Sequence, residues 1–228
     1  RDDMLRIEHV FLTHSHLDHV AGLPLMVDTM ACDRIGRPVH VHALPQTIAA
    51  LRAHVFNGVI WPDFSCLPSP DIPLVRFHPL EVGELRELSG RVIEALPARH
   101  SVPAVGYAVR RQVPGAPSWV FSGDTCGHPD FWRRVNQLQV HSLVIETAFA
   151  NRERELAQMA QHLSPAVLAE ELDHIDRARR YPIYITHTKP ADTEVIMREI
   201  AQFDQVRPPR SEVSHDIRWR SAGHVFQL

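Results

Sequence analysis

Short apolar runs rich in β-branched residues alternate along the chain with longer stretches in which apolar residues recur every three or four positions. The short runs predict strands, because Val, Ile, Thr and aromatic residues favour extended backbone. These runs are residues 10–13, 39–42, 92–96, 107–109, 119–122, 143–145 and 183–186. The longer stretches predict helices at residues 21–29, 45–56, 166–179 and 193–203. This alternation is typical of an α/β fold.

Local signals mark the boundaries of three of these helices. Ser164 and Pro165 supply an N-cap and a first helical residue for helix 166–179. Asp192 stands before helix 193–203, and Asn57-Gly58 closes helix 45–56. The helical boundaries are therefore expected within a few residues of these positions.

The length and composition describe one folded domain. A chain of 228 residues, at about 150 residues per domain, favours a single domain over residues 1–228. Hydrophobic residues make up 44% and charged residues 22%, as in globular proteins. No apolar run reaches the roughly 18 to 20 residues that a membrane span needs, so we expect no integral membrane segment. Three cysteines without a CxxC pair do not suggest a disulfide framework.

The charge balance narrows the class of partner. The chain has 24 Lys and Arg residues against 27 Asp and Glu residues, a net charge of −3. This balance argues against a broad basic surface, so we expect no extended nucleic acid as a partner. An anionic substrate would need a local source of positive charge.

Sixteen histidines stand out in the composition, and their main cluster lies at the start of the chain. The segment reads Thr13-His14-Ser15-His16-Leu17-Asp18-His19, directly after a predicted strand. Residues two apart in extended backbone point to the same side, so His14 and His16 can converge on one metal ion. Asp18 and His19 begin the next turn and can reach a second ion. The spacing predicts that one loop serves two metals.

Three further candidate ligands lie at the ends of predicted strands. They are His100, Asp124 and His187. We assign His14, His16 and His100 to the first ion, Asp18, His19 and His187 to the second, and Asp124 as a carboxylate that bridges both. His78 lies in the same interval as His100 and follows a less regular run.

This ligand set defines the expected chemistry. Imidazole and carboxylate ligands without thiolate suit Zn²⁺, which we expect, and also Mn²⁺ or Fe. Two divalent ions contribute +4 against two carboxylates, which leaves a positive centre. Paired metal ions lower the pKa of water from 15.7 towards about 7 and stabilise both oxygens of a displacement at phosphorus. Hydrolysis of a phosphodiester is the natural use of such a centre.

These segments resemble the metallo-β-lactamase superfamily, and within it the class II cyclic-nucleotide phosphodiesterases. The similar segments are His14–Leu23, Phe56–Phe64, His100 with Val105-Gly106-Tyr107, Phe121–Thr125, Ile145–Phe149, His162–Pro165 and Ile185–Pro190. The resemblance implies an αββα sandwich and hydrolysis of 3′,5′-cyclic AMP or cyclic GMP to 5′-nucleoside monophosphates. Members of the superfamily carry several strands before the histidine loop, whereas only a short segment precedes His14. We therefore expect the first N-terminal strands of one sheet to be missing.

The resemblance also implies a proton donor. In the related tRNA 3′-processing nucleases, a Glu in a Glu-Ala-Thr motif and a His before Ser or Thr supply a proton to the leaving oxygen. Glu146-Thr147-Ala148 and His162-Leu163-Ser164 look similar. We predict Glu146 and His162 as catalytic residues. The structural alternative is that Glu146 ends a strand and His162 lies at a helix terminus.

Several alternatives stay open. An RNase Z-like tRNA 3′-processing endonuclease is the second enzyme reading, although the chain shows no Lys/Arg-rich insertion that would dock RNA. A catalytically silent metal-binding or nucleotide-binding domain is the third. Phe56, Trp61, Phe64 and Phe149 are expected in the core, with stacking on a nucleobase as the alternative. A homodimer and a cytoplasmic location are expectations, with the periplasm as the other compartment.

Overall fold

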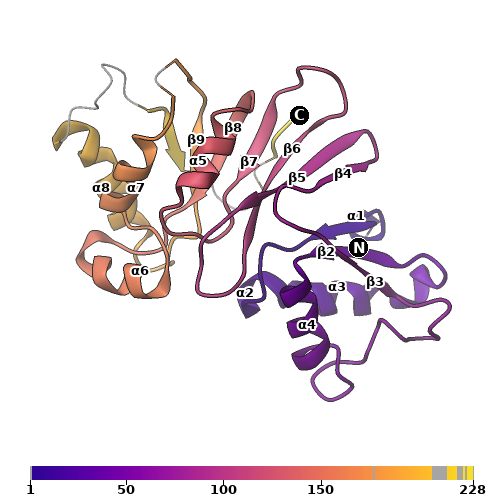
Figure 1. Cartoon of the computed structure of the whole chain (residues 1–228). Coiled ribbons are helices and arrows are strands. Elements are labelled where there is room, and N and C mark those ends of the chain that lie inside the picture. The colour runs from indigo at the N-terminus through magenta and orange to yellow at the C-terminus, as the bar shows by residue number, and fades with distance from the viewer. Residues whose placement is uncertain (1, 177, 207–214, 220–222, 224, 228) are drawn as a thin grey trace. The chain divides into compact units, whose positions relative to one another are not determined.

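The computed structural model describes residues 2–176, 178–206, 215–219, 223 and 225–227. The chain divides into two compact units, an N-terminal unit of residues 1–81 and a C-terminal unit of residues 82–228. Each unit contains one β-sheet (Figure 1). Each also has its own hydrophobic core. Helices and strands alternate, as the sequence predicts.

The N-terminal unit is built on a three-stranded parallel sheet in the order β1-β2-β3. Its strands are β1 (His9–Phe11), β2 (Val39–Ala43) and β3 (Val75–Pro79). Its helices are α1 (Asp2–Leu5), α2 (Leu17–Val20), α3 (Gly22–Met30), the 3₁₀ turn η1 (Ala31–Arg34) and α4 (Pro45–His54). Val41 of β2 is completely buried together with Met30 of α3 and Leu51 of α4. One face of the sheet therefore forms the core of this unit.

The other face of this sheet carries four histidines. Alternation along β2 directs His40 and His42 away from the face that holds Val41. His40 Nδ1 lies 2.7 Å from His78 Nε2, and His9 Nδ1 lies 3.1 Å from His42 Nε2. One pair stacks on the other: the ring of His9 lies on that of His40, with centroids 5.0 Å apart, and the ring of His42 lies on that of His78, with centroids 4.9 Å apart. His78 is thus a partner of His40 within this sheet.

The C-terminal unit contains a seven-stranded mixed sheet in the order β10-β9-β8-β7-β6-β5-β4. Its strands are β4 (Leu85–Leu88), β5 (Arg91–Pro97), β6 (Val105–Arg111), β7 (Ser118–Phe121), β8 (Val140–Glu146), β9 (Ile183–Thr186) and β10 (Ile217–Trp219). Strands β4 to β7 are antiparallel, and β7 to β10 are parallel. The parallel half brings the carboxyl ends of β7, β8 and β9 to one edge.

Three helices of the C-terminal unit pack into the core of this sheet. The helical elements are α5 (Pro129–Val135), the 3₁₀ turn η2 (Asn151–Glu153), α6 (Arg154–Ala160), α7 (Pro165–Leu172) and α8 (Thr193–Val206). Val135 of α5, Leu168 of α7 and Ile196 of α8 are buried together with Leu143 and Ile183 of the sheet. α5 packs against β5, where Arg134 Nε lies 2.6 Å from Glu94 Oε1.

The predicted strands are all present, and three further strands were missed. Missed strands β3 and β4 carry polar and exposed residues such as Arg76 and Glu87, and β10 is three residues long. The predicted helix 166–179 was wrong at its end, because α7 ends at Leu172. Asn136 explains the early end: its side chain donates to His174 O and accepts from Asp176 N, which fixes a turn there. Residue 177 of that prediction lies outside the described residues.

Two further findings concern membrane spans and cysteines. No helix in the described part of the chain has the length and apolarity needed to cross a membrane. Cys32, Cys66 and Cys126 are free thiols. α7 begins where the sequence predicts, with extended Ser164 before Pro165 in the first helical turn, but the Ser164 side chain makes no capping hydrogen bond.

Candidate metal centre

The N-terminal unit places its four predicted ligands in the loop and short helix after β1. His14 is completely buried, and its Nε2 lies 3.1 Å from Nδ1 of His16. His16 has extended backbone, with φ −63° and ψ 146°, and stands immediately before α2. The extended spacing therefore brings the two imidazoles together, as the sequence predicts. Asp18 and His19 open α2, with Asp18 Oδ2 3.6 Å from His19 Nε2.

Thr13 holds the histidines of this loop, a role that was not predicted. Its Oγ1 lies 3.0 Å from Nδ1 of His14 and 3.5 Å from Nδ1 of His19. A hydroxyl bonded to Nδ1 of an imidazole fixes the ring orientation, so that Nε2 is the expected ligand atom. The only sequence signal for Thr13 is its position directly before His14.

The C-terminal unit places its three predicted ligands after the ends of three strands. His100 follows β5, Asp124 follows β7 and His187 follows β9. Asp124 is 2% exposed, and its Oδ2 lies 3.2 Å from Nε2 of His187. Ligand atoms of His100, Asp124 and His162 all lie within 4.8 Å of one another. The structure therefore gathers predicted ligands from distant parts of the sequence within this unit.

A backbone carbonyl orients His100. Gln161 O lies 3.1 Å from Nδ1 of His100. Gln161 ends α6 in the left-handed conformation, with φ 57° and ψ 49°. Non-glycine residues rarely adopt this region, and such residues cluster at functional sites. A histidine that donates its Nδ1–H to a carbonyl presents Nε2 to a metal, which is the usual arrangement of metal ligands.

Glu146 and His162, the two predicted catalytic residues, are in direct contact. Oε1 of Glu146 lies 2.8 Å from Nδ1 of His162, and the Glu146 side chain is completely buried. Three backbone N–H groups also donate to this carboxyl group: Thr125 N, Ala148 N and Leu163 N. Burial and the charge of Asp124 raise the pKa of Glu146, and the backbone donors act in the opposite direction. Each of these three backbone N–H groups donates a hydrogen bond that a carboxylate oxygen can accept.

The ring of His162 stands between two predicted ligands. Its centroid lies 4.7 Å from that of His100 and 5.4 Å from that of His187, and it is stacked on the latter. Phe149, 8% exposed, contacts the same ring at a centroid distance of 5.6 Å. Phe149 thus forms part of the wall around His162.

The other aromatic residues singled out in the sequence belong to the N-terminal unit. Phe56 is 2% and Phe64 is 5% exposed, and both lie in the core cluster of that unit. Trp61 is partly buried against the same cluster. The expectation that these rings are core residues is confirmed.

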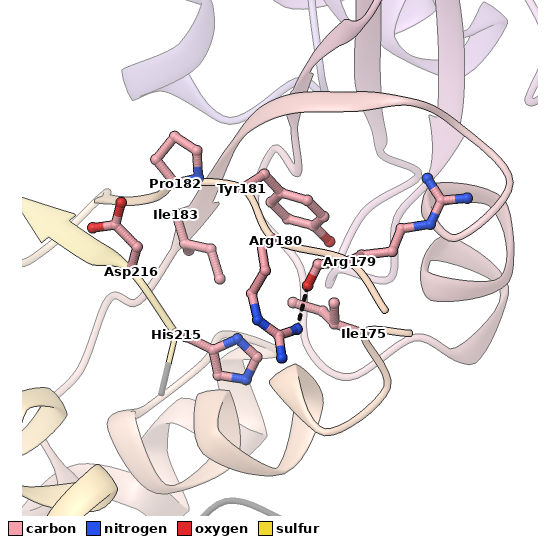
Figure 2. A pocket seen from close by; sticks show the side chains of 8 residues that line it. All are labelled: Ile175, Arg179, Arg180, Tyr181, Pro182, Ile183, His215 and Asp216. Carbon is pink, nitrogen blue, oxygen red and sulfur yellow. Dashed lines mark hydrogen bonds between the residues drawn. The ribbon is translucent and has the colours of Figure 1, made fainter. Parts of the chain in front are cut away.

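A pocket of about 240 Å³ in the C-terminal unit has none of these residues in its lining (Figure 2). Its lining includes Arg180, Tyr181 and His215. Figure 2 shows the hydrogen bond from Arg180 to the carbonyl oxygen of Arg179, 2.6 Å long. Burial raises the pKa of the Tyr181 hydroxyl. The predicted chemistry does not use this pocket.

Comparison with protein families gives one match over most of the chain. The family model described as "Beta-lactamase superfamily domain" matches residues 1–187. That range includes all seven predicted metal ligands together with Glu146 and His162.

The chain is also similar to individual characterised proteins. The chain is 23% identical over 238 residues to 3′,5′-cyclic-nucleotide phosphodiesterase 1 of Saccharomyces cerevisiae. That alignment covers 93% of this chain and 61% of the yeast protein, so the chain spans about three fifths of the relative's length. It is 34% identical over 102 residues to Ribonuclease Z of Kineococcus radiotolerans, covering 45% of this chain and 30% of that protein.

Solved structures agree on the fold. Unliganded yeast PDE1 superposes with a TM-score of 0.79 at 21% identity, covering 94% of this chain and 66% of the yeast chain. The metallo-beta-lactamase fold protein YhfI from Bacillus subtilis gives a TM-score of 0.69 at 13% identity, covering 96% and 76%. The predicted metallo-β-lactamase-like α/β fold is confirmed.

Proposed function

Because the chain belongs to the beta-lactamase superfamily, we propose that it is a metal-dependent phosphodiesterase that hydrolyses 3′,5′-cyclic nucleotides to 5′-nucleoside monophosphates. The yeast phosphodiesterase supports this choice, because its alignment covers 93% of the chain. The observation that carries the proposal is the contact of 2.8 Å between Glu146 and His162, beside His100 and Asp124. It joins an acid–base group to a cluster of metal-type ligands.

We propose that the seven predicted ligands hold two divalent metal ions, with Zn²⁺ as the expected metal and Mn²⁺ or Fe as alternatives. His14, His16 and His100 would hold one ion, Asp18, His19 and His187 the other, and Asp124 both. The donor set fits, because two imidazole nitrogens lie 3.1 Å apart in the N-terminal unit, and an imidazole nitrogen and a carboxylate oxygen lie 3.2 Å apart in the C-terminal unit. When bound, such ions neutralise phosphate charge and lower the pKa of water.

The residues of the chain supply the proton for the leaving oxygen. Nδ1 of His162 is hydrogen-bonded to Glu146, so the ring delivers a proton from Nε2. Buried Glu146 holds the His162 ring in one orientation, because its own position is fixed by three backbone donors. In a 3′,5′-cyclic nucleotide this proton goes to the 3′-oxygen as its bond to phosphorus breaks.

The test is hydrolysis by metal-loaded protein. Wild type should convert cyclic AMP or cyclic GMP to the 5′-monophosphate, and His162→Asn should lower kcat by about 10²- to 10⁴-fold. His174→Asn is the matched control, since His174 is an exposed histidine of the same unit. Cleavage of model phosphodiesters without any turnover of cyclic nucleotides would reject the proposed substrate.

The alternative activity is that of a tRNA 3′-processing nuclease. Relatives named Ribonuclease Z match 45–47% of the chain, which favours this alternative less than the yeast enzyme. Faster turnover of a tRNA precursor than of either cyclic nucleotide would reverse the order. Tight nucleotide binding without turnover in a metal-loaded sample would instead indicate a silent binding domain. The homodimer and the cytoplasmic location stay predictions.

A further inference from the structure

A cavity of about 410 Å³ lies beside His162 within the C-terminal unit. Residues from three segments line it: Arg99 after β5, Cys126 after β7, and Arg154, Gln158, His162 and Glu170 from the region of α6 and α7. His162 is the one residue of this cavity that the proposed reaction uses. The charged residues of the wall take no part in that reaction.

The place of His162 in the reaction indicates which part of a substrate reaches this cavity, so the inference rests on the proposed function. The proton from His162 goes to the 3′-oxygen, which stays on the ribose after the bond to phosphorus breaks. The ribose and its base therefore lie on the side of the substrate that faces His162. A cavity that shares His162 as its wall is in position to take the base.

The wall of the cavity offers both signs of charge next to each other. Arg154 Nη2 lies 3.4 Å from Glu170 Oε1, and the two side chains are 52% and 51% exposed. The Arg99 guanidinium has no hydrogen-bond or ion-pair partner among the described residues. Guanidinium groups only donate hydrogen bonds and a carboxylate only accepts them. The cavity therefore combines donors from Arg99 and Arg154 with an acceptor from Glu170.

This combination matches the edge of guanine better than that of adenine. Guanine presents O6 and N7 as acceptors, which suit an arginine, and N1–H and N2–H₂ as donors, which suit a carboxylate. Adenine places its N6–H₂ donor where guanine has O6, so an arginine there would face another donor. We propose that this cavity binds the base of the nucleotide and selects guanine, which makes cyclic GMP the preferred substrate.

Equilibrium binding of the two reaction products tests the proposal without relying on turnover. Titration calorimetry of the metal-loaded protein should show 5′-GMP binding about 10-fold or more tightly than 5′-AMP. Glu170→Ala should remove most of this preference by weakening 5′-GMP. Glu155→Ala is the control, because Glu155 is exposed on α6 and does not line the cavity. The control should keep the wild-type preference.

Equal or tighter binding of 5′-AMP, or a full guanine preference in Glu170→Ala, would overturn the proposal. The same samples, assayed for hydrolysis, separate this result from the proposed function. A guanine preference without hydrolysis of cyclic GMP would leave the binding site standing and reject the activity. Hydrolysis of both cyclic nucleotides without any preference in product binding would support the activity and reject the guanine-binding site.

Discussion

The carbonyl oxygen of Gln161 lies 3.1 Å from Nδ1 of His100, across 61 positions of the sequence. The next residue, His162, is held by Glu146. One turn at the end of α6 therefore positions a predicted metal ligand and the predicted proton donor together. The left-handed backbone of Gln161, with φ 57°, is what directs this carbonyl.

Replacing Gln161 tests whether this backbone conformation supports metal binding. Gln161→Val should weaken zinc binding by about 10-fold or more, because a β-branched residue is strained at positive φ and the carbonyl would shift. Gln161→Gly should bind zinc like wild type, since glycine adopts this conformation without strain. Competition with a chromogenic chelator measures both. Equal affinities in the two variants would show that the conformation of residue 161 does not matter.

Glu146 should be a structural as well as a catalytic residue. Glu146→Gln places an amide N–H₂ where the carboxylate accepts backbone N–H groups, and it should lower the free energy of unfolding by about 1–3 kcal/mol. Urea unfolding of the metal-free protein measures this loss. The exposed control Glu155→Gln should be neutral. Wild-type stability in Glu146→Gln would contradict the role of these hydrogen bonds.

Much of the candidate site could be predicted because its side chains follow simple backbone rules. Extended spacing brings His14 to His16, and the ends of the parallel strands β7 and β9, which flank β8, bring Asp124 to His187. Gln161 could not be predicted, since it acts through its backbone carbonyl and any residue type carries one. The carbonyl's direction depends on a left-handed conformation that a glutamine does not signal.

Some strands of the fold could be predicted from the sequence and others could not. Strands with buried aliphatic residues, such as β8 and β9, were predicted because their hydrophobic pattern is strong. Strand β3 was missed because one of its faces carries the polar residues Arg76 and His78. The structure accounts for His78 on this face, because it pairs with His40 of β2. Strand β4 is an edge strand whose exposed positions give little pattern.

The histidine pairs predict loss of stability in acid. Burial, His78, His9 and Arg76 lower the pKa of His40, against a smaller opposite effect of Glu8. The unfolded chain therefore binds more protons than the folded chain below the ordinary histidine pKa of about 6.5, and stability falls as the pH drops from there towards the lowered value. His40→Gln should flatten this dependence in urea unfolding between pH 5 and 8.

His54→Gln is the matched control for this experiment, because His54 is exposed at the end of α4. It should keep the wild-type dependence on pH. A wild-type unfolding free energy that stays constant between pH 5 and 8, or rises towards pH 5, would contradict the proposed effect of His40.

Gly106 should tolerate no side chain. A Cβ at Gly106 would lie 2.7 Å from the carbonyl oxygen of Ser122, a backbone atom that cannot rotate away. Gly106→Ala should therefore cost about 1–3 kcal/mol of unfolding free energy. Gly22→Ala is the control, because nothing lies within 4 Å of a Cβ there. Thermal unfolding that ranks Gly22→Ala as the less stable variant would refute this prediction.

The metal content of the chain tests the central claim most directly. Elemental analysis of purified, zinc-loaded protein should give two ions per chain, and His14→Ala and His187→Ala should each lower that number. This outcome is expected because the proposal assigns His14 to one ion and His187 to the other. A wild-type content of one ion or none per chain, or two ions retained in both variants, would contradict the account.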